Sequence, residues 1–122
     1  MKIFSGVRND FMKKMIYHKL VRDRIPEIIT ADGGVPEVRV LDEGAFKAAL
    51  RDKMVEEAGE LANAKTREEI LNELADILQL VESVAQVEDV TIAEVESKKQ
   101  NKKVERGGFD QRWFLERVEK FE

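Results

Sequence analysis

Residues 42–86 decide the fold, and they read DEGAFKAALRDKMVEEAGELANAKTREEILNELADILQLVESVAQ. Apolar residues recur in this stretch at intervals of three and four, the spacing that places side chains on one face of an α-helix. Asp42 suits the residue before a helix, and Thr66 followed by Glu69 has the spacing of a capping box. The stretch therefore predicts two long helices in succession. They are expected at residues 43–65 and 67–86.

The flanking residues predict shorter elements. Residues 17–24 read as an irregular segment, followed by a short helix with Pro26 in its first turn that ends near Gly33, because proline is tolerated only at a helix start. Asp89 or Thr91 is expected to cap a further helix that ends before Gly107.

Two segments remain ambiguous. Val38–Leu41 is a candidate strand after a proline. Arg112–Leu115 could pair with it as a second strand or could form a terminal helix. We therefore expect an all-α helical bundle, in which one small two-stranded β element is an option.

The length of 122 residues suits one domain, since two halves would each be too small for a core. Residues 1–16 are expected to form an N-terminal extension, and residues 17–122 a single helical domain. The second long helix has a broad apolar face that a monomer would leave under-covered, so we expect oligomerisation to complete the bundle.

The composition excludes several classes of protein. The 25 acids outnumber the 21 bases, giving a net charge of −4 that argues against a binder of nucleic-acid polymers. There is no cysteine, which excludes disulfides and thiolate metal sites, and a single histidine excludes a multi-histidine zinc site within one chain. No apolar run approaches the roughly 20 residues of a membrane span, and the N-terminus lacks the apolar core of a signal peptide. We therefore expect a soluble cytoplasmic protein whose metal, if it binds one, is held by carboxylates.

Each long helix carries acids where apolar residues belong. At about 100° per residue, Glu57 lies about 20° from Leu50 on the buried face of the first helix. Glu73 lies about 20° from Leu80 in the second. Glu60 and Asp76 each follow three residues later, at the edge of the same face, giving the patterns Glu-x-x-Glu and Glu-x-x-Asp.

Four such carboxylates cannot be buried together without positive charge between them. A hard divalent cation fits an all-oxygen site, and Mg²⁺ is usually completed by substrate phosphates. Two alternatives remain open: a solvated surface pattern, which is common in so acidic a chain, and salt bridges to a basic partner helix.

Two basic groups accompany the acids. Residues 98–106 hold five bases and one acid, and three of the bases share a face by their spacing: Lys99, Lys103 and Arg106. They suit phosphate, although bases also favour a helix C-terminus. For the second group, Lys19, Arg22 and Arg24, structural ion pairing and ligand contact are equally consistent with the sequence.

The ordered motifs resemble a known family. Glu56–Leu61 and Glu73–Leu78 resemble the signature of the all-α nucleotide pyrophosphohydrolases, the MazG-like proteins and their relatives. Lys19–Ile29 and Arg106–Phe109 resemble the short, single-domain MazG-like members. The resemblance implies Mg²⁺-dependent hydrolysis of a nucleoside triphosphate, including modified, house-cleaning substrates, to the monophosphate and pyrophosphate. It also implies a homodimer or homotetramer, and Mn²⁺ is the alternative ion.

The resemblance also assigns roles to residues. The metal ligands would be Glu57, Glu60, Glu73 and Asp76. Glu56 would position or deprotonate the attacking water. The substrate phosphates would be contacted by Lys53, Lys99, Lys103 and Arg106.

Two rival functions are retained. Phosphoribosyl-ATP pyrophosphatase has a similar pair of acidic helices, but the segment that begins at Lys19 and the one at Arg106 argue against it. A non-catalytic helical module that binds a metal or a protein would use the same acids to organise an interface.

Overall fold

The computed structural model describes residues 14–122, and four helices follow one another in that part of the chain. They are α1 (Ile25–Ala31), α2 (Glu43–Asn63), α3 (Arg67–Val87) and α4 (Ile92–Arg106). The expected all-α class is confirmed for the described residues. Most of the extension predicted at residues 1–16 lies outside them.

The helix starts follow the predicted caps. Asp42 Oδ1 accepts from the backbone N–H of Ala45 at 2.8 Å, and Thr66 Oγ1 accepts from that of Glu69 at 3.1 Å. The Glu69 carboxylate accepts from the backbone of Lys65 instead of Thr66, so the capping box is incomplete there. It is complete at α4, where Thr91 is the cap. These bonds satisfy N–H groups that a helix start leaves without partners.

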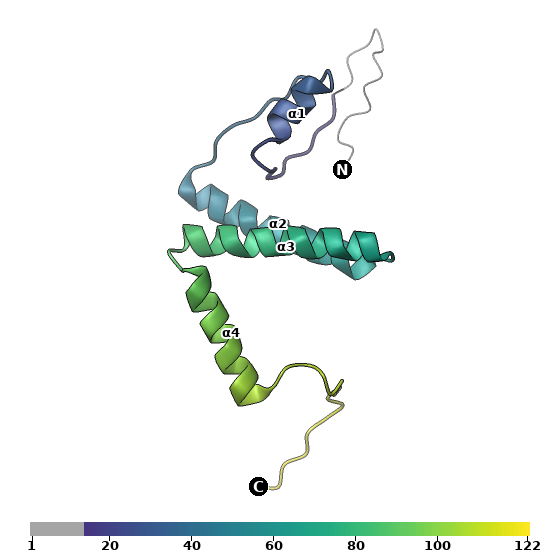
Figure 1. Cartoon of the computed structure of the whole chain (residues 1–122), viewed down its shortest axis with the longest axis vertical. Helices are drawn as coiled ribbons and strands as arrows, with labels where there is room; N and C mark the ends of the chain where they lie inside the picture. Colours follow the sequence, from purple (N-terminus) through teal and green to yellow (C-terminus); the bar gives the residue numbers. More distant parts are fainter. Residues whose placement is uncertain (1–13) are drawn as a thin grey trace.

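Helices α2 and α3 run antiparallel as a hairpin, with residues 64–66 connecting them (Figure 1). Ala64 is extended, and α2 therefore ends at Asn63, two residues before the predicted end. Leu50 from α2 is 2% exposed and packs in the same small core as Leu80 and Ala85 from α3. The hairpin thus holds most of the buried apolar side chains of the described residues.

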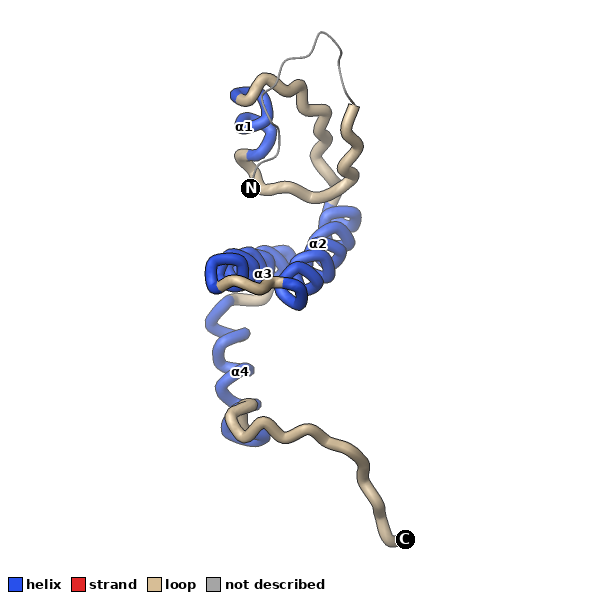
Figure 2. The backbone as a smooth tube through the Cα atoms, turned by 90° about the vertical axis from the view of Figure 1, so that its right-hand side faces the viewer, coloured by secondary structure: helices blue, strands red, loops and turns tan. Residues whose placement is uncertain are grey.

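The other elements lie at opposite ends of the molecule. α1 and the segment before it lie above the hairpin, whereas α4 leads away below it, with the C-terminal residues extended beyond (Figures 1 and 2). This separation explains why the optional β element was wrong. Val38–Leu41 and Arg112–Leu115 lie at different ends, and residues 14–122 contain no strand. The alternative terminal helix is not formed either.

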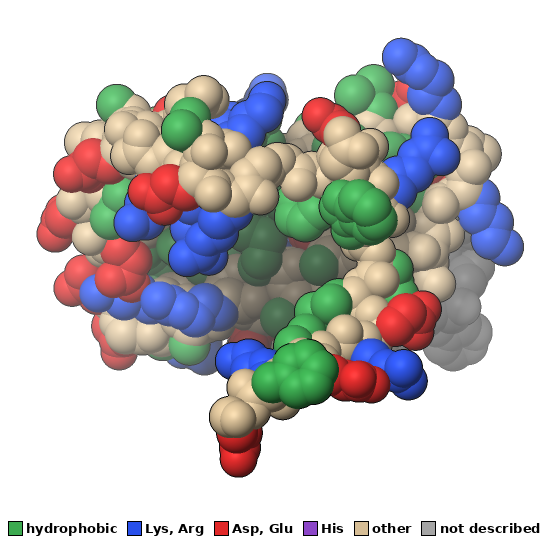
Figure 3. Space-filling view, turned by 90° about the horizontal axis from the view of Figure 1, so that it is seen from below, with side chains coloured by type: hydrophobic (Ala, Val, Ile, Leu, Met, Phe, Trp, Pro, Cys, Tyr) green, Lys and Arg blue, Asp and Glu red, His purple; other side chains and the backbone are tan. Residues whose placement is uncertain are grey.

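Large apolar side chains remain exposed in this single chain. On α3 they form a stripe of Leu71, Leu74 and Leu78, and beyond α4 they include Phe109, Trp113 and Phe121. A hollow between the hairpin and α4 is also lined by apolar groups, among them Met54, Val81 and Val95. Figure 3 shows hydrophobic side chains inside a hollow on this side of the molecule. No helix among the described residues is long and apolar enough to cross a membrane.

Candidate active site

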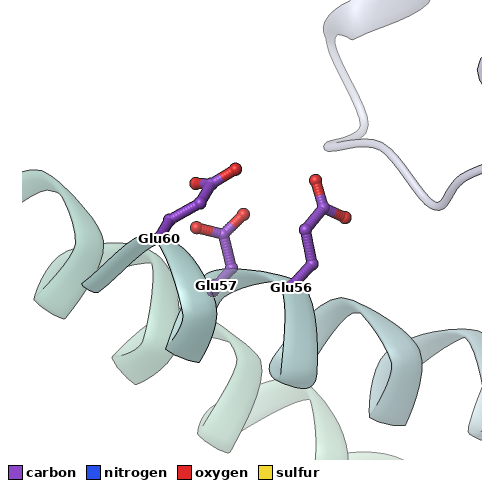
Figure 4. A group of neighbouring side chains, drawn as sticks. All are labelled: Glu56, Glu57 and Glu60. Atoms are coloured by element: carbon purple, nitrogen blue, oxygen red, sulfur yellow. The ribbon is translucent and has the colours of Figure 1, made fainter. Parts of the chain in front are cut away.

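Five carboxylates gather on the α2–α3 hairpin. Glu56, Glu57 and Glu60 extend from the same side of α2 (Figure 4), and one oxygen of each lies within 4.8 Å of the others. Glu57 also forms a group of the same dimensions with Glu73 and Asp76 from α3. The four acids predicted as metal ligands are therefore brought together from both helices, and Glu57 is common to the two groups.

Glu57 is the centre of this cluster and is only 5% exposed. Its Oε2 atom is buried without a hydrogen-bond partner, and so is Oε2 of Glu73 on the facing helix. A buried polar atom without a partner is costly, and two acceptors cannot satisfy each other without a proton or a cation between them. This pair of carboxylate oxygens fits a hard divalent cation, which prefers oxygen ligands.

The electrostatics of the cluster agree with this geometry. Burial, followed by hydrogen bonding with Glu73 and Glu60 and the charge of Glu60, raises the pKa of Glu57 to about 8. Burial also raises the pKa of Glu60. Hydrogen bonding with Glu57 lowers the pKa of Glu73, against the effect of burial. The raised pKa of Glu57 and the lowered pKa of Glu73 favour a proton on Glu57 rather than on Glu73.

Three cations face the acids. Lys53 Nζ lies 3.4 Å from Glu56 and 3.7 Å from Glu57. Lys19 Nζ lies 3.7 Å from Glu56, and Arg22 Nη2 lies 2.7 Å from Asp76. Lys53, predicted to contact substrate phosphates, thus lies within the acidic cluster.

The contacts of Lys19 and Arg22 were not predicted. The sequence marked both residues as basic but left their partners open, because the partners are far away along the chain. For Arg22 the separation is 54 residues. The only local signal is that Lys19 and Arg22 both belong to the irregular segment before α1.

The basic residues of α4 lie apart from the acids. Lys99 pairs with Glu96 on its own helix at 2.8 Å. Lys103 and Arg106 lie in the last turn of α4, which leads away from the hairpin (Figure 1). Within residues 14–122 of one chain, no ion pair joins these three bases to the acidic cluster. One chain therefore does not unite the predicted phosphate contacts on α4 with the predicted metal ligands.

The fold and the cluster define an all-α protein with a carboxylate site suited to a hard divalent cation. The chain belongs to the phosphoribosyl-ATP pyrophosphohydrolase family, whose model matches residues 17–103. This is a MazG-like all-α family, as the motifs implied.

The family match includes the segment that begins at Lys19. That segment therefore does not argue against a relationship to the phosphoribosyl-ATP pyrophosphohydrolases, contrary to the inference from the sequence. The chain is also 49% identical over 53 residues to an uncharacterized protein from Mycolicibacterium smegmatis (strain ATCC 700084 / mc(2)155). The matched region is 43% of this chain and 54% of that relative, so the chain spans about half its length. No solved structure matches the chain significantly.

Proposed function

We propose that this protein is a Mg²⁺-dependent nucleoside triphosphate pyrophosphohydrolase that produces a monophosphate and pyrophosphate. Modified nucleotides are the proposed substrates, and Mn²⁺ is the alternative ion. The observation that carries the proposal is the pair of buried carboxylate oxygens without partners, on Glu57 and Glu73. They face each other across a hairpin whose family hydrolyses phosphoanhydrides.

Four residues would hold the ion: Glu57, Glu60, Glu73 and Asp76. When bound, the ion would neutralise charge on the substrate phosphates and lower the pKa of a water molecule. Glu57 must release its proton as the ion enters, because a carboxylic acid is a poor ligand. The site is therefore expected to exchange a proton for the cation, which then supplies the positive charge between the two buried carboxylates.

Glu56 is proposed to accept the proton of the attacking water. It belongs to the cluster but is more exposed than Glu57, so a water molecule can reach it. Lys53 and Lys19 hold its two oxygens, which orients the carboxylate before substrate arrives. The water oxygen forms a bond to phosphorus as its proton passes to Glu56, and the bond from phosphorus to the leaving pyrophosphate breaks.

The assembly is proposed to be a homodimer or homotetramer. In one chain α4 leads away from the acids, and the stripe formed by Leu71, Leu74 and Leu78 on α3 is exposed. We propose that a second copy covers this stripe. In such an assembly Lys99, Lys103 and Arg106 of one copy are proposed to contact phosphates at the site of another.

Phosphoribosyl-ATP is the second candidate substrate, because the matching family takes its name from that reaction. It shares the triphosphate chain and would use the same acids. The two candidates differ in the group attached to the nucleotide base.

The test is pyrophosphate release by the purified protein with Mg²⁺, Mn²⁺ or EDTA. The panel contains ordinary nucleoside triphosphates, modified ones and phosphoribosyl-ATP. Release from a triphosphate that needs the divalent cation supports the first candidate, and turnover of phosphoribosyl-ATP alone supports the second. If every nucleotide is left intact under all conditions, the enzymatic proposal is wrong and a non-catalytic binding module is the better interpretation.

A further inference from the structure

The irregular segment at residues 17–24 is attached to both helices of the site. Lys19 reaches Glu56 on α2, and Arg22 reaches Asp76 on α3. These two ion pairs place two cations of one short segment beside carboxylates from the two helices of the hairpin. The segment therefore crosses the site as a strap, defined here by residues 17–24.

Each of these two cations can still bind a second anion. The side chain of Arg22 is 58% exposed, and within the described residues it donates one hydrogen bond, through Nη2. A guanidinium carries five N–H donors, so donors of Arg22 remain for another anion. The Lys19 ammonium lies 3.7 Å from Glu56, which is an ion-pair distance longer than a short hydrogen bond. Both ion pairs are partly exposed to solvent, where an ion pair contributes only modestly to stability, so stabilising the fold does not account fully for them.

The other basic residues are less suited to bind an anion at the acidic cluster. Lys53 is more buried than Arg22 and lies against Glu56 and Glu57. The bases of α4 are not joined to the acids by any ion pair in the described part of the chain. Lys19 and Arg22 are thus the exposed cations that this chain itself brings to the rim of its acidic cluster.

We propose that Lys19 and Arg22 bind the phosphate groups of the substrate, an inference that rests on the proposed function. Glu56 and Asp76 hold the two cations in place before the substrate arrives, which reduces the ordering that binding would otherwise require. The free N–H groups of Arg22 then donate to phosphate oxygens, for which the planar guanidinium is well shaped. Lys19 adds a second positive charge three residues away on the strap.

The test measures binding of inorganic pyrophosphate in the presence of Mg²⁺ by calorimetry. Arg22→Ala and Lys19→Ala are each expected to weaken binding by about tenfold or more, the usual loss for a hydrogen bond to a charged group. Arg24→Ala is the matched control. Arg24 is a neighbouring exposed arginine that pairs with Glu27 of α1 at 2.6 Å, and its removal should leave binding unchanged.

Arg22→Lys keeps a positive charge beside Asp76 but lacks the planar guanidinium group and its several N–H donors. It is expected to keep the apo melting temperature of the wild type and to bind pyrophosphate several-fold more weakly. If Arg22→Ala does not fold, Arg22→Lys still tests whether Arg22 binds phosphate. Wild-type affinity in both Arg22→Lys and Lys19→Ala would overturn the proposal, as would a wild-type protein that does not bind pyrophosphate.

The binding assay also separates this proposal from the proposed function. If no nucleotide is hydrolysed but pyrophosphate binding depends on Lys19 and Arg22, the strap is a phosphate site in a protein of another activity. If nucleotides are hydrolysed and the variants bind pyrophosphate normally, the enzyme stands and the strap has no part in phosphate binding.

Discussion

Substitution of Glu57 by glutamine should remove a pH dependence from the stability of the metal-free protein. Glu57 is 5% exposed, and its environment raises its pKa from 4.5 to about 8. An unfolded chain has no such environment, so the native state holds a proton that the unfolded state lacks between these two values. The stability that this proton provides is complete below pH 4.5 and is lost as the pH rises through 8.

The slope follows from one proton. Each pH unit within the window lowers the free energy of unfolding by about 1.4 kcal/mol. The total loss across the whole window is at most about 5 kcal/mol. The pKa of Glu60 is also raised, which acts in the same direction. The pKa of Glu73 is lowered, so its contribution is lost only in more acidic solution, outside this window.

Glutamine has the shape of the protonated carboxyl group and carries no charge at any pH. The free energy of unfolding of Glu57→Gln should therefore be close to that of the wild type at pH 5. At pH 8 the variant should be more stable than the wild type, by as much as a few kcal/mol. Urea unfolding in EDTA at pH 5, 6.5 and 8 measures this difference, and the slope against urea shows whether the transition stays two-state.

Glu68→Gln is the control, because Glu68 is an exposed acid in the first turn of α3. It removes one carboxylate without touching the cluster and should keep the pH slope of the wild type. Equal slopes for the wild type and Glu57→Gln would refute the reasoning, and so would a control that flattens the slope as much as Glu57→Gln does.

Three further predictions concern the ion, the mechanism and the assembly. Mg²⁺ should raise the melting temperature over EDTA, with a stabilisation of about 2.7 kcal/mol at a hundredfold excess over its dissociation constant, and identical melts would count against the metal site. Glu73→Gln should abolish pyrophosphate release and keep the metal-free fold, because it removes a proposed ligand and a buried charge. Glu68→Gln should stay active. Comparable activity in the two variants would place the site elsewhere. Sedimentation at tens of micromolar protein should give a mass above the 14.0 kDa of one chain, and a monomer mass would contradict the proposed covering of Leu71, Leu74 and Leu78.

The helices could be predicted because their signals are local. Asp42, Thr66 and Thr91 each bond to an N–H three residues later, so the residues that start a helix are adjacent in the sequence. The burial of Glu57 also follows from local geometry, since the helical period fixes its angle to Leu50. That angle placed Glu57 on the buried face without knowledge of the partner helix.

The remaining features depend on distant neighbours. Arg22 finds Asp76 only because the strap crosses the hairpin, and no periodicity encodes that path. Ala58 and Leu74 follow the spacing of three and four that marks the apolar residues of this stretch, yet both are exposed. A helix with a single close partner buries a narrower stripe than its sequence pattern suggests. The ambiguous residues 112–115 form neither a strand nor a helix, because no element of the described chain lies beside them.

The single tryptophan makes fluorescence emission a specific probe of the C-terminal residues. Trp113 is 89% exposed, and it belongs to the segment after α4, which leads away from the hairpin (Figure 1). An indole in water emits at longer wavelength than one in an apolar surrounding, so the emission of the free chain reports on the C-terminal residues alone. Unfolding of the hairpin should barely change the tryptophan emission. Any surface that covers the C-terminal residues should shift the emission to the blue. Far-ultraviolet circular dichroism would follow the helices, and the two signals together would separate the folding of the hairpin from the docking of the C-terminus.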